Sequence, residues 1–242
     1  MNKQKPMILY ENTVPAIFVR RVNRFVAEVL INGQSEMVHV KNTGRLGELL
    51  IPEAKVTLQK ADHGKRATAY DLISVYKPKL KWVNIDSQAP NVLMKQQLET
   101  LHYDLVKPEF SCGDSRIDFY MERGGGKYLT EVKGCTLASD RLPGIGLFPD
   151  APTERGVKHL KELAAAAKQG YHCSIAFVIQ MNGIHLVLPN DDTQPEFGRA
   201  MREAARAGVQ IVYYSCHVEA DSIRMTKAAQ SGKSAGFRMD TA

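Results

Sequence analysis

The sequence lacks the features of a membrane-spanning or exported protein. Its 242 residues contain no apolar run that approaches the roughly 18 residues needed to span a bilayer. The N-terminal segment also lacks an apolar core followed by small residues, which a signal peptide would have. We therefore expect a cytoplasmic protein that does not insert into a membrane.

Cysteine and tryptophan are scarce, with four and one residues respectively. No two cysteines form a C-x-x-C pair, which disfavours a zinc knuckle. In a reducing cytoplasm we expect free thiols that are buried as small hydrophobic groups. The four residues are Cys112, Cys135, Cys173 and Cys216.

The charge is uneven along the chain. Hydrophobic residues make up 44% and charged residues 24% of the sequence, proportions typical of a globular protein. Residues 1–86 contain 14 lysines and arginines against 8 aspartates and glutamates, whereas residues 87–242 contain 18 of each. The net charge of +6 therefore lies in the first third. This excess points to a polyanionic partner for that part, with simple solubility as the equal alternative.

The first third has the pattern of a small β-barrel. Turn signals such as Asn32-Gly33 and Asn42-Thr43-Gly44 separate short segments rich in β-branched residues. Five short strands at close spacing are typical of an OB-like barrel, a design that commonly binds oligonucleotides. The strands are expected at 22–30, 36–41, 55–58, 67–75 and 81–85.

The sequence changes character near Asp86, where we place the boundary between a first domain, 1–86, and a second domain, 87–242. Helices are expected from a capping Asn91 to 101, from 154 to 168 after a capping Thr153, and from 196 to 207. This order predicts a mixed α/β domain, and the tail after Arg224 is expected to fray. Its strands are expected at 105–111, 116–121, 127–133, 173–180, 184–188 and 209–216.

A hairpin in this domain carries the most informative residues. If its turn is 123–126, pairs of residues whose numbers sum to 249 face each other. Asp118 then lies opposite Glu131, and Arg116 lies opposite Lys133. Side chains alternate along a strand, so all four share one face.

Two carboxylates placed opposite each other repel, and a divalent cation would relieve the repulsion. Lys133 reaches the same face, where its ammonium could orient a water molecule or hold a phosphate. The alternative, given about equal weight, is a solvated face on which lysines and arginines pair with the acids.

The spacing of Asp118, Glu131 and Lys133 resembles the D…(D/E)xK signature of the PD-(D/E)xK nuclease superfamily. Longer strings make the sequence similar, over nearly its whole length, to the sugar fermentation stimulation protein A family. The strings are HVKNTGRL at 39–46, WVN at 82–84, SRIDF at 115–119, EVKGCTL at 131–137 and FPDAPTERG at 148–156. One departure is Lys41, where family members often have proline.

The resemblance implies an N-terminal OB-like barrel of five strands followed by a restriction-endonuclease-like α/β domain. It also implies DNA binding with little sequence specificity and a regulatory link to sugar (maltose) metabolism. Carried over, the motif makes Asp118 and Glu131 ligands of Mg²⁺ or Mn²⁺ and makes Lys133 catalytic. A third acid could come from Glu109 or, slightly less favoured, from Glu99.

Basic residues outside the motif are candidate DNA contacts. Arg155 and Lys158 lie at the start of a predicted helix, where a phosphate is favoured, although Lys158 also suits an ion pair with Glu154. A helix-turn-helix at 201–220 would identify a non-catalytic DNA-binding regulator, but 209–215 has the composition of a strand. The nucleic-acid-binding candidates are Arg20, Arg21, Arg24, Lys41, Asn42, Arg45, Arg116, Arg155 and Lys158.

Overall fold

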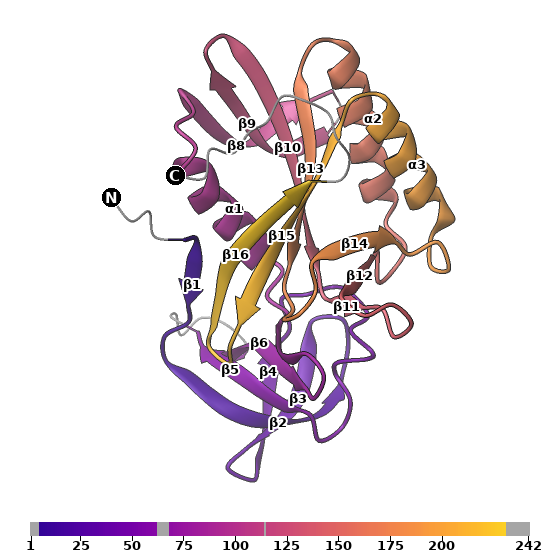
Figure 1. Ribbon diagram of the computed structural model, residues 1–242. Helices are drawn as coiled ribbons and strands as arrows, with labels where there is room; N and C mark the ends of the chain where they lie inside the picture. The colour runs from indigo at the N-terminus through magenta and orange to yellow at the C-terminus, as the bar shows by residue number, and fades with distance from the viewer. Residues whose placement is uncertain (1–4, 62–67, 114, 231–242) are drawn as a thin grey trace.

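The protein has a β-barrel at one end and an α/β sandwich at the other (Figure 1). The computed structural model describes residues 5–61, 68–113 and 115–230. No helix in these ranges is long and apolar enough to cross a membrane. The expected fold class, an OB-like barrel followed by a mixed α/β domain, is confirmed.

The barrel is a curled sheet whose strand order is β4-β3-β2-β5-β6-β7. His39 of β4 pairs with Asp71 of β6, and this contact closes β2 to β6 into a barrel of five strands. β7 continues from β6 as a hairpin. The strands are β2 (Thr13–Arg21), β3 (Val26–Ile31), β4 (Gln34–His39), β5 (Lys55–Lys60), β6 (Tyr70–Lys77) and β7 (Lys81–Asn84).

The sequence pattern misplaced the start of the barrel. β2 was not expected as a strand, yet it pairs with both β3 and β5. The strand expected to begin at Val22 begins at Val26, because the Asn23 side chain accepts hydrogen bonds from the N–H groups of Phe25 and Val26 and makes a turn there. The expected start of another strand, Ala67, lies outside the described residues.

The second domain is built on a seven-stranded sheet of order β1-β16-β15-β13-β10-β9-β8. β10, β13 and β15 run parallel, and the other neighbours are antiparallel. A small sheet of β11 (Leu137–Ala138), β12 (Ile145–Phe148) and β14 (Leu186–Pro189) lies beside it. The seven strands are β1 (Met7–Leu9), β8 (Leu105–Cys112), β9 (Ser115–Arg123), β10 (Gly126–Cys135), β13 (His172–Ile179), β15 (Gln210–Val218) and β16 (Ser222–Gln230).

Three helices cover the two faces of this sheet (Figure 1). α1 (Ala89–Glu99) packs on one face, and its Leu93, Met94 and Leu98 belong to one buried apolar cluster. α2 (Glu154–Lys168) and α3 (Pro195–Arg206) pack on the other face within a second, larger cluster. α2 has the predicted bounds and the predicted cap, because the Thr153 hydroxyl accepts from Gly156 N–H at 3.0 Å.

The two ends of the chain meet in the sheet. The segment after Arg224, expected to fray, forms the second half of β16 as far as Gln230. β16 pairs with β15 on one side and with β1 on the other, so the N-terminal strand joins the second domain (Figure 1). The later residues of the expected frayed tail, 231–242, lie outside the described residues.

The thiols are free, as expected, and three of the four are buried. Burial raises the pKa of Cys135, Cys173 and Cys216 to about 12. At neutral pH these side chains are therefore neutral thiols packed in the core.

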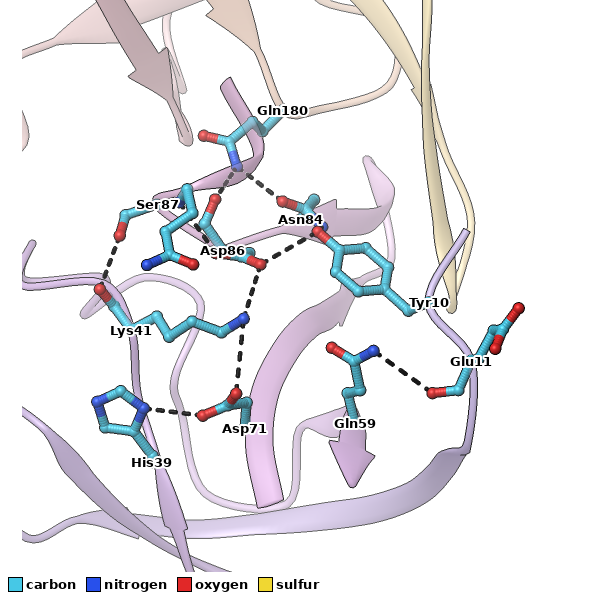
Figure 2. Close-up of polar contacts among 11 residues, drawn as sticks. Tyr10, Glu11, His39, Lys41, Gln59, Asp71, Asn84, Asp86, Ser87 and Gln180 are labelled. Carbon is cyan, nitrogen blue, oxygen red and sulfur yellow. Dashed lines mark hydrogen bonds and ion pairs between the residues drawn. The ribbon is translucent and has the colours of Figure 1, made fainter. Parts of the chain in front are cut away.

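Polar side chains join the barrel to the sheet (Figure 2). Gln180, which follows β13, donates from Nε2 to Asn84 Oδ1 at 2.7 Å and to the Asp86 carbonyl at 2.9 Å. Asn84 in turn donates to the Tyr10 hydroxyl at 3.0 Å, and Asp86 accepts from Lys41 at 2.9 Å. These bonds tie the link between the domains to the end of β13.

Candidate active site

The hairpin of β9 and β10 has the predicted turn and register. Gly126 pairs with Arg123, and the predicted register, in which the numbers of paired residues sum to 249, continues to the pair of Thr130 with Phe119. The ladder then stops, so the expected pairings of Asp118 with Glu131 and of Arg116 with Lys133 are both wrong. Beyond this point β9 stays paired with β8, and β10 stays paired with β13.

Asp118 lies where the two strands part. Its Oδ2 accepts from the Val132 N–H of β10 at 2.7 Å, in place of a backbone acceptor. Its Oδ1 accepts from the Asn91 side chain of α1 at 2.9 Å. Asn91 is therefore not the expected helix cap, because α1 begins at Ala89 and places Asn91 in its first turn, facing Asp118.

Glu131 is almost fully buried on the α2 face of the sheet, with 2% of its surface exposed. Its Oε1 accepts from Lys133 Nζ at 2.5 Å and from the Nδ1 of His159, a buried residue of α2. Its Oε2 is buried as well and accepts no hydrogen bond from the described residues. Since a carboxylate can accept at both oxygens, one side of Glu131 is left available to a ligand.

The environment shifts the pKa values of the two carboxyl groups in opposite directions. Burial raises the pKa of Asp118, and the negative charge of Glu131 raises it further. Burial alone would also raise the pKa of Glu131, but hydrogen bonds and charges from His159 and Lys133 outweigh it and lower that pKa. Glu131 is thus a stable carboxylate, while Asp118 lacks a full countercharge.

A hydrogen-bonded chain leads from the surface of α2 to Glu131. The exposed Arg155 donates from Nε to His159 Nε2 at 3.3 Å. Because His159 Nε2 accepts this bond, the ring proton of a neutral His159 sits on Nδ1 and is donated to Glu131. The remaining nitrogens of Arg155 make no hydrogen bond to the described residues, so they can contact a phosphate.

The two acids predicted as a third metal ligand lie at exposed positions. Glu109 is exposed and lies 3.8 Å from Arg116, without contact to Asp118 or Glu131 among the interactions of the described residues. The alternative, Glu99, is exposed at the far end of α1. These positions do not test whether Glu109 or Glu99 binds a metal ion, so both assignments stay predictions.

Two candidate DNA contacts have internal roles instead. The Lys41 ammonium is buried between Asp86, at 2.9 Å, and Asp71, at 3.6 Å (Figure 2). The Arg21 guanidinium donates to the carbonyls of Arg24, Asn42, Gly44 and Arg45 at 2.7 to 2.9 Å. Both cations already bind groups of the protein, and their assignment as phosphate contacts stays a prediction.

The other candidates remain accessible. Arg24 and Arg45 are exposed on the loops that Arg21 holds. Arg20 is exposed and pairs with Glu28 at 2.8 Å. Asn42 uses its Oδ1 to accept from Gly44 N–H, and Lys158 lies 3.8 Å from Glu162.

Sequence reasoning missed the roles of Asn91 and His159. His159 lies three residues beyond the string at 148–156, and this position was the only signal for it in the sequence. A histidine six residues after the Thr153 cap reaches Glu131 only once α2 is docked on β10, which no local pattern specifies.

The chain matches known proteins over both domains. The family model described as the sugar fermentation stimulation protein RE domain matches residues 88–222. The chain belongs to the sugar fermentation stimulation protein family. A second model of this family, the SfsA N-terminal OB domain, matches residues 19–85.

Relatives and a solved structure of this family agree with that assignment. A sugar fermentation stimulation protein homolog of Desulfitobacterium hafniense is 46% identical over 217 residues, covering 88% of this chain and 93% of that protein. A homolog of Ruminiclostridium cellulolyticum is 45% identical, covering 91% and 98%. The structure of Pyrococcus furiosus SfsA in complex with Ca²⁺ superposes with a TM-score of 0.80 at 29% identity, covering 92% and 96%.

Proposed function

We propose that this member of the sugar fermentation stimulation protein family binds DNA and cleaves its phosphodiester backbone with a divalent metal ion. The observation that carries the proposal is the Glu131 carboxylate. It is buried, charged and fixed by Lys133 and His159, yet its Oε2 has no partner among the described residues. A buried polar atom without a partner is costly, and natural proteins keep one mainly where a ligand completes it.

The residues fit Mg²⁺ or Mn²⁺. The described residues contain no group of three or more histidine, cysteine, aspartate and glutamate side chains arranged for a metal ion. Mg²⁺ requires less, because it is usually held by one or two carboxylates together with water and substrate phosphate. Glu131 and Asp118 supply those carboxylates, and a cation would relieve the electrostatic cost at Asp118. The related Pyrococcus furiosus structure is described as a complex with Ca²⁺, another cation that prefers oxygen ligands.

Each side chain then has a defined part in the reaction. The metal, when bound, supplies charge stabilisation and lowers the pKa of a coordinated water. Lys133 places a positive charge beside Glu131, where it stabilises the charge that develops on the phosphate. His159 fixes the orientation of Glu131, and Arg155 binds a neighbouring phosphate from the start of α2.

The exposed cations of both domains give the protein an affinity for the DNA backbone. Arg20, Arg24 and Arg45 lie on the barrel, and Arg116 and Lys158 lie on the second domain. Contacts of this kind go to phosphates, so they carry little sequence information and weaken as salt rises.

The test is cleavage of labelled single- and double-stranded DNA with Mg²⁺, Mn²⁺ or EDTA. Glu131→Gln and Lys133→Ala are expected to bind DNA but to lose cleavage. Glu196→Gln and Lys127→Ala are matched controls at exposed positions and are expected to cleave like the wild type. A wild-type protein that binds DNA but never cleaves it with either metal would overturn the nuclease proposal.

The second candidate function is a non-catalytic DNA-binding regulator linked to sugar metabolism. The observation in its favour is the name of the relatives, which refers to stimulation of sugar fermentation. This regulator would not use a helix-turn-helix at 201–220, because β15 occupies 210–218 as a buried strand. DNA binding without cleavage in the same assay is the result expected for it.

A further inference from the structure

A cleft of about 390 Å³ opens between the barrel and the second domain. Its barrel wall is the loop of Asn42, Thr43 and Gly44 together with Arg24. Its other wall comes from the end of β10 and the segment that leads into α2, including Asp150 and Thr153. The wall includes Gly134, which follows Lys133 in β10, and Thr153, which caps α2, the helix that carries Arg155 and His159.

The size of the cleft limits what can enter it. A volume of about 390 Å³ lies near the lower end of small-molecule sites, which span roughly 300–1,000 Å³. One nucleotide is a molecule of this class. A base-paired duplex is far larger and cannot enter a cleft of this volume.

The lining of the cleft has three chemical parts. Among the described residues that line the cleft, Arg24 is the only cation and Asp150 is the only anion. Leu137, Leu147 and Phe148 contribute apolar surface between them. A nucleotide offers the matching parts, with an anionic phosphate, a flat base with apolar faces, and a base edge that carries N–H donors.

Two acceptors in the cleft have no partner. Asp150 accepts no hydrogen bond within the described part of the chain, although its charge attracts the nearby Arg21 guanidinium and raises the pKa of that group. Gln180 is 1% exposed, and its Nε2 donates to Asn84 and to Asp86, while its Oε1 accepts no bond from any described residue. Figure 2 shows this oxygen turned away from Asn84 and Asp86. A buried amide whose oxygen faces the cleft without a partner indicates a ligand that donates hydrogen bonds.

The barrel wall is preorganised to receive such a ligand. The Arg21 guanidinium binds the carbonyls of Asn42, Gly44 and Arg45 and also that of Arg24, which fixes both loops of this wall. Gly44 leaves space for the opposing carboxylate, because a Cβ at this position would lie 2.2 Å from Asp150 Oδ2. A wall that is already ordered loses little entropy when a ligand binds.

We propose that this cleft binds one unpaired nucleotide of a DNA strand. Arg24 holds its phosphate, the apolar wall packs on its base, and Asp150 accepts a hydrogen bond from the amino group of adenine or cytosine. Thymine has no amino group, and its single donor on this edge, N3–H, lies between two carbonyl oxygens that the Asp150 carboxylate would repel. Since this inference rests on the proposed function, it defines the substrate of the neighbouring site as single-stranded or frayed DNA.

The test measures binding in EDTA, where no metal-dependent cleavage occurs. Fluorescence anisotropy gives the Kd of the full-length protein for labelled dA, dC and dT 12-mers and for a 12-base-pair duplex. The wild type is expected to bind dC and dA about tenfold more tightly than dT, a modest value for a side chain–base contact. Asp150→Asn is expected to remove most of this preference, whereas Asp192→Asn, an exposed control, keeps it.

Two further variants separate the roles of the residues. Gly44→Ala places a methyl group against the Asp150 carboxylate. This variant is therefore expected to remove the base preference while Asp150 itself is unchanged in sequence. Arg24→Ala is expected to weaken binding to all three 12-mers by a similar factor. Circular dichroism spectra establish that each variant is folded.

Three results would overturn the proposal: equal affinity of the wild type for the three 12-mers, an unchanged preference in Asp150→Asn, or tighter binding of the duplex than of any single strand. Failure of the proposed nuclease function looks different. It would leave the base preference in EDTA intact while DNA with Mg²⁺ or Mn²⁺ stays uncut.

Discussion

Replacing Lys41 by methionine should destabilise the protein by removing the cation at the centre of a buried ionic cluster. The ammonium lies 2.9 Å from Asp86 and 3.6 Å from Asp71, and the three side chains are 13%, 6% and 9% exposed respectively. Methionine keeps most of the aliphatic stem, so the main change is the loss of charge. Two carboxylates are then left in the interior without this cation, although Asp71 still contacts His39 Nδ1 and Asp86 still accepts from the Tyr10 hydroxyl and Gln88 N–H.

The expected loss is about 3–5 kcal/mol, the range measured when one partner of a buried ion pair is removed. For a chain of this size, such a loss corresponds to a fall in Tm of roughly 6–20 °C. The assay is urea unfolding followed by the fluorescence of Trp82, the only tryptophan, which lies in β7 next to the barrel.

Two variants control this measurement. Lys127→Met, at an exposed position of the hairpin, should change stability by no more than about 0.5 kcal/mol. The double variant Lys41→Met/Asp86→Asn should recover part of the loss, because it removes one uncompensated charge. A loss below about 1 kcal/mol in Lys41→Met would refute the argument that the protein interior requires this cation.

Further predictions concern the proposed site. His159→Gln should lower metal-dependent cleavage about 10–100-fold while DNA binding in EDTA is kept, because Glu131 loses the group that orients it; an unchanged kcat would contradict this. Asp118→Asn should abolish cleavage but raise thermal stability. Asp118 has a raised pKa in the folded state, so its ionisation opposes folding as pH rises from about 3.9 to the raised value. The stabilisation of Asp118→Asn relative to the wild type should therefore be absent well below this pH range and complete above it. Thermal melts of both proteins across pH would show this. Arg21→Lys should weaken binding of all DNA strands, because a lysine cannot hold four carbonyls on two loops at once.

Local patterns were sufficient wherever a residue's role depends on its near neighbours in sequence. The glycines at 124–126 fixed the hairpin turn and hence the register of β9 and β10 near it. Thr153 predicted the start of α2 because a cap depends on residues only three positions apart. The strand composition of 209–215 correctly excluded a recognition helix.

Roles that depend on distant elements were not predictable in this way. A lysine in a basic segment is usually solvated, and only the fold reveals that Asp71 and Asp86 enclose Lys41. β1 has only three residues, and β16 is rich in polar residues, so neither has a clear strand pattern. They form strands because their backbones pair with each other at the edge of the sheet.

The end of the β9–β10 ladder depends both on the local hairpin pattern and on contacts with distant helices. Continued pairing would have placed Asp118 directly opposite Glu131, with two like charges in contact. Instead the Asp118 carboxylate replaces a backbone acceptor for Val132 N–H, and the strands part there. The parting gives Asn91 access to Asp118 from one face of the sheet, while His159 holds Glu131 from the other. Two carboxylates that the hairpin register would have placed opposite each other are thus oriented by side chains from different helices, Asp118 by Asn91 of α1 and Glu131 by His159 of α2.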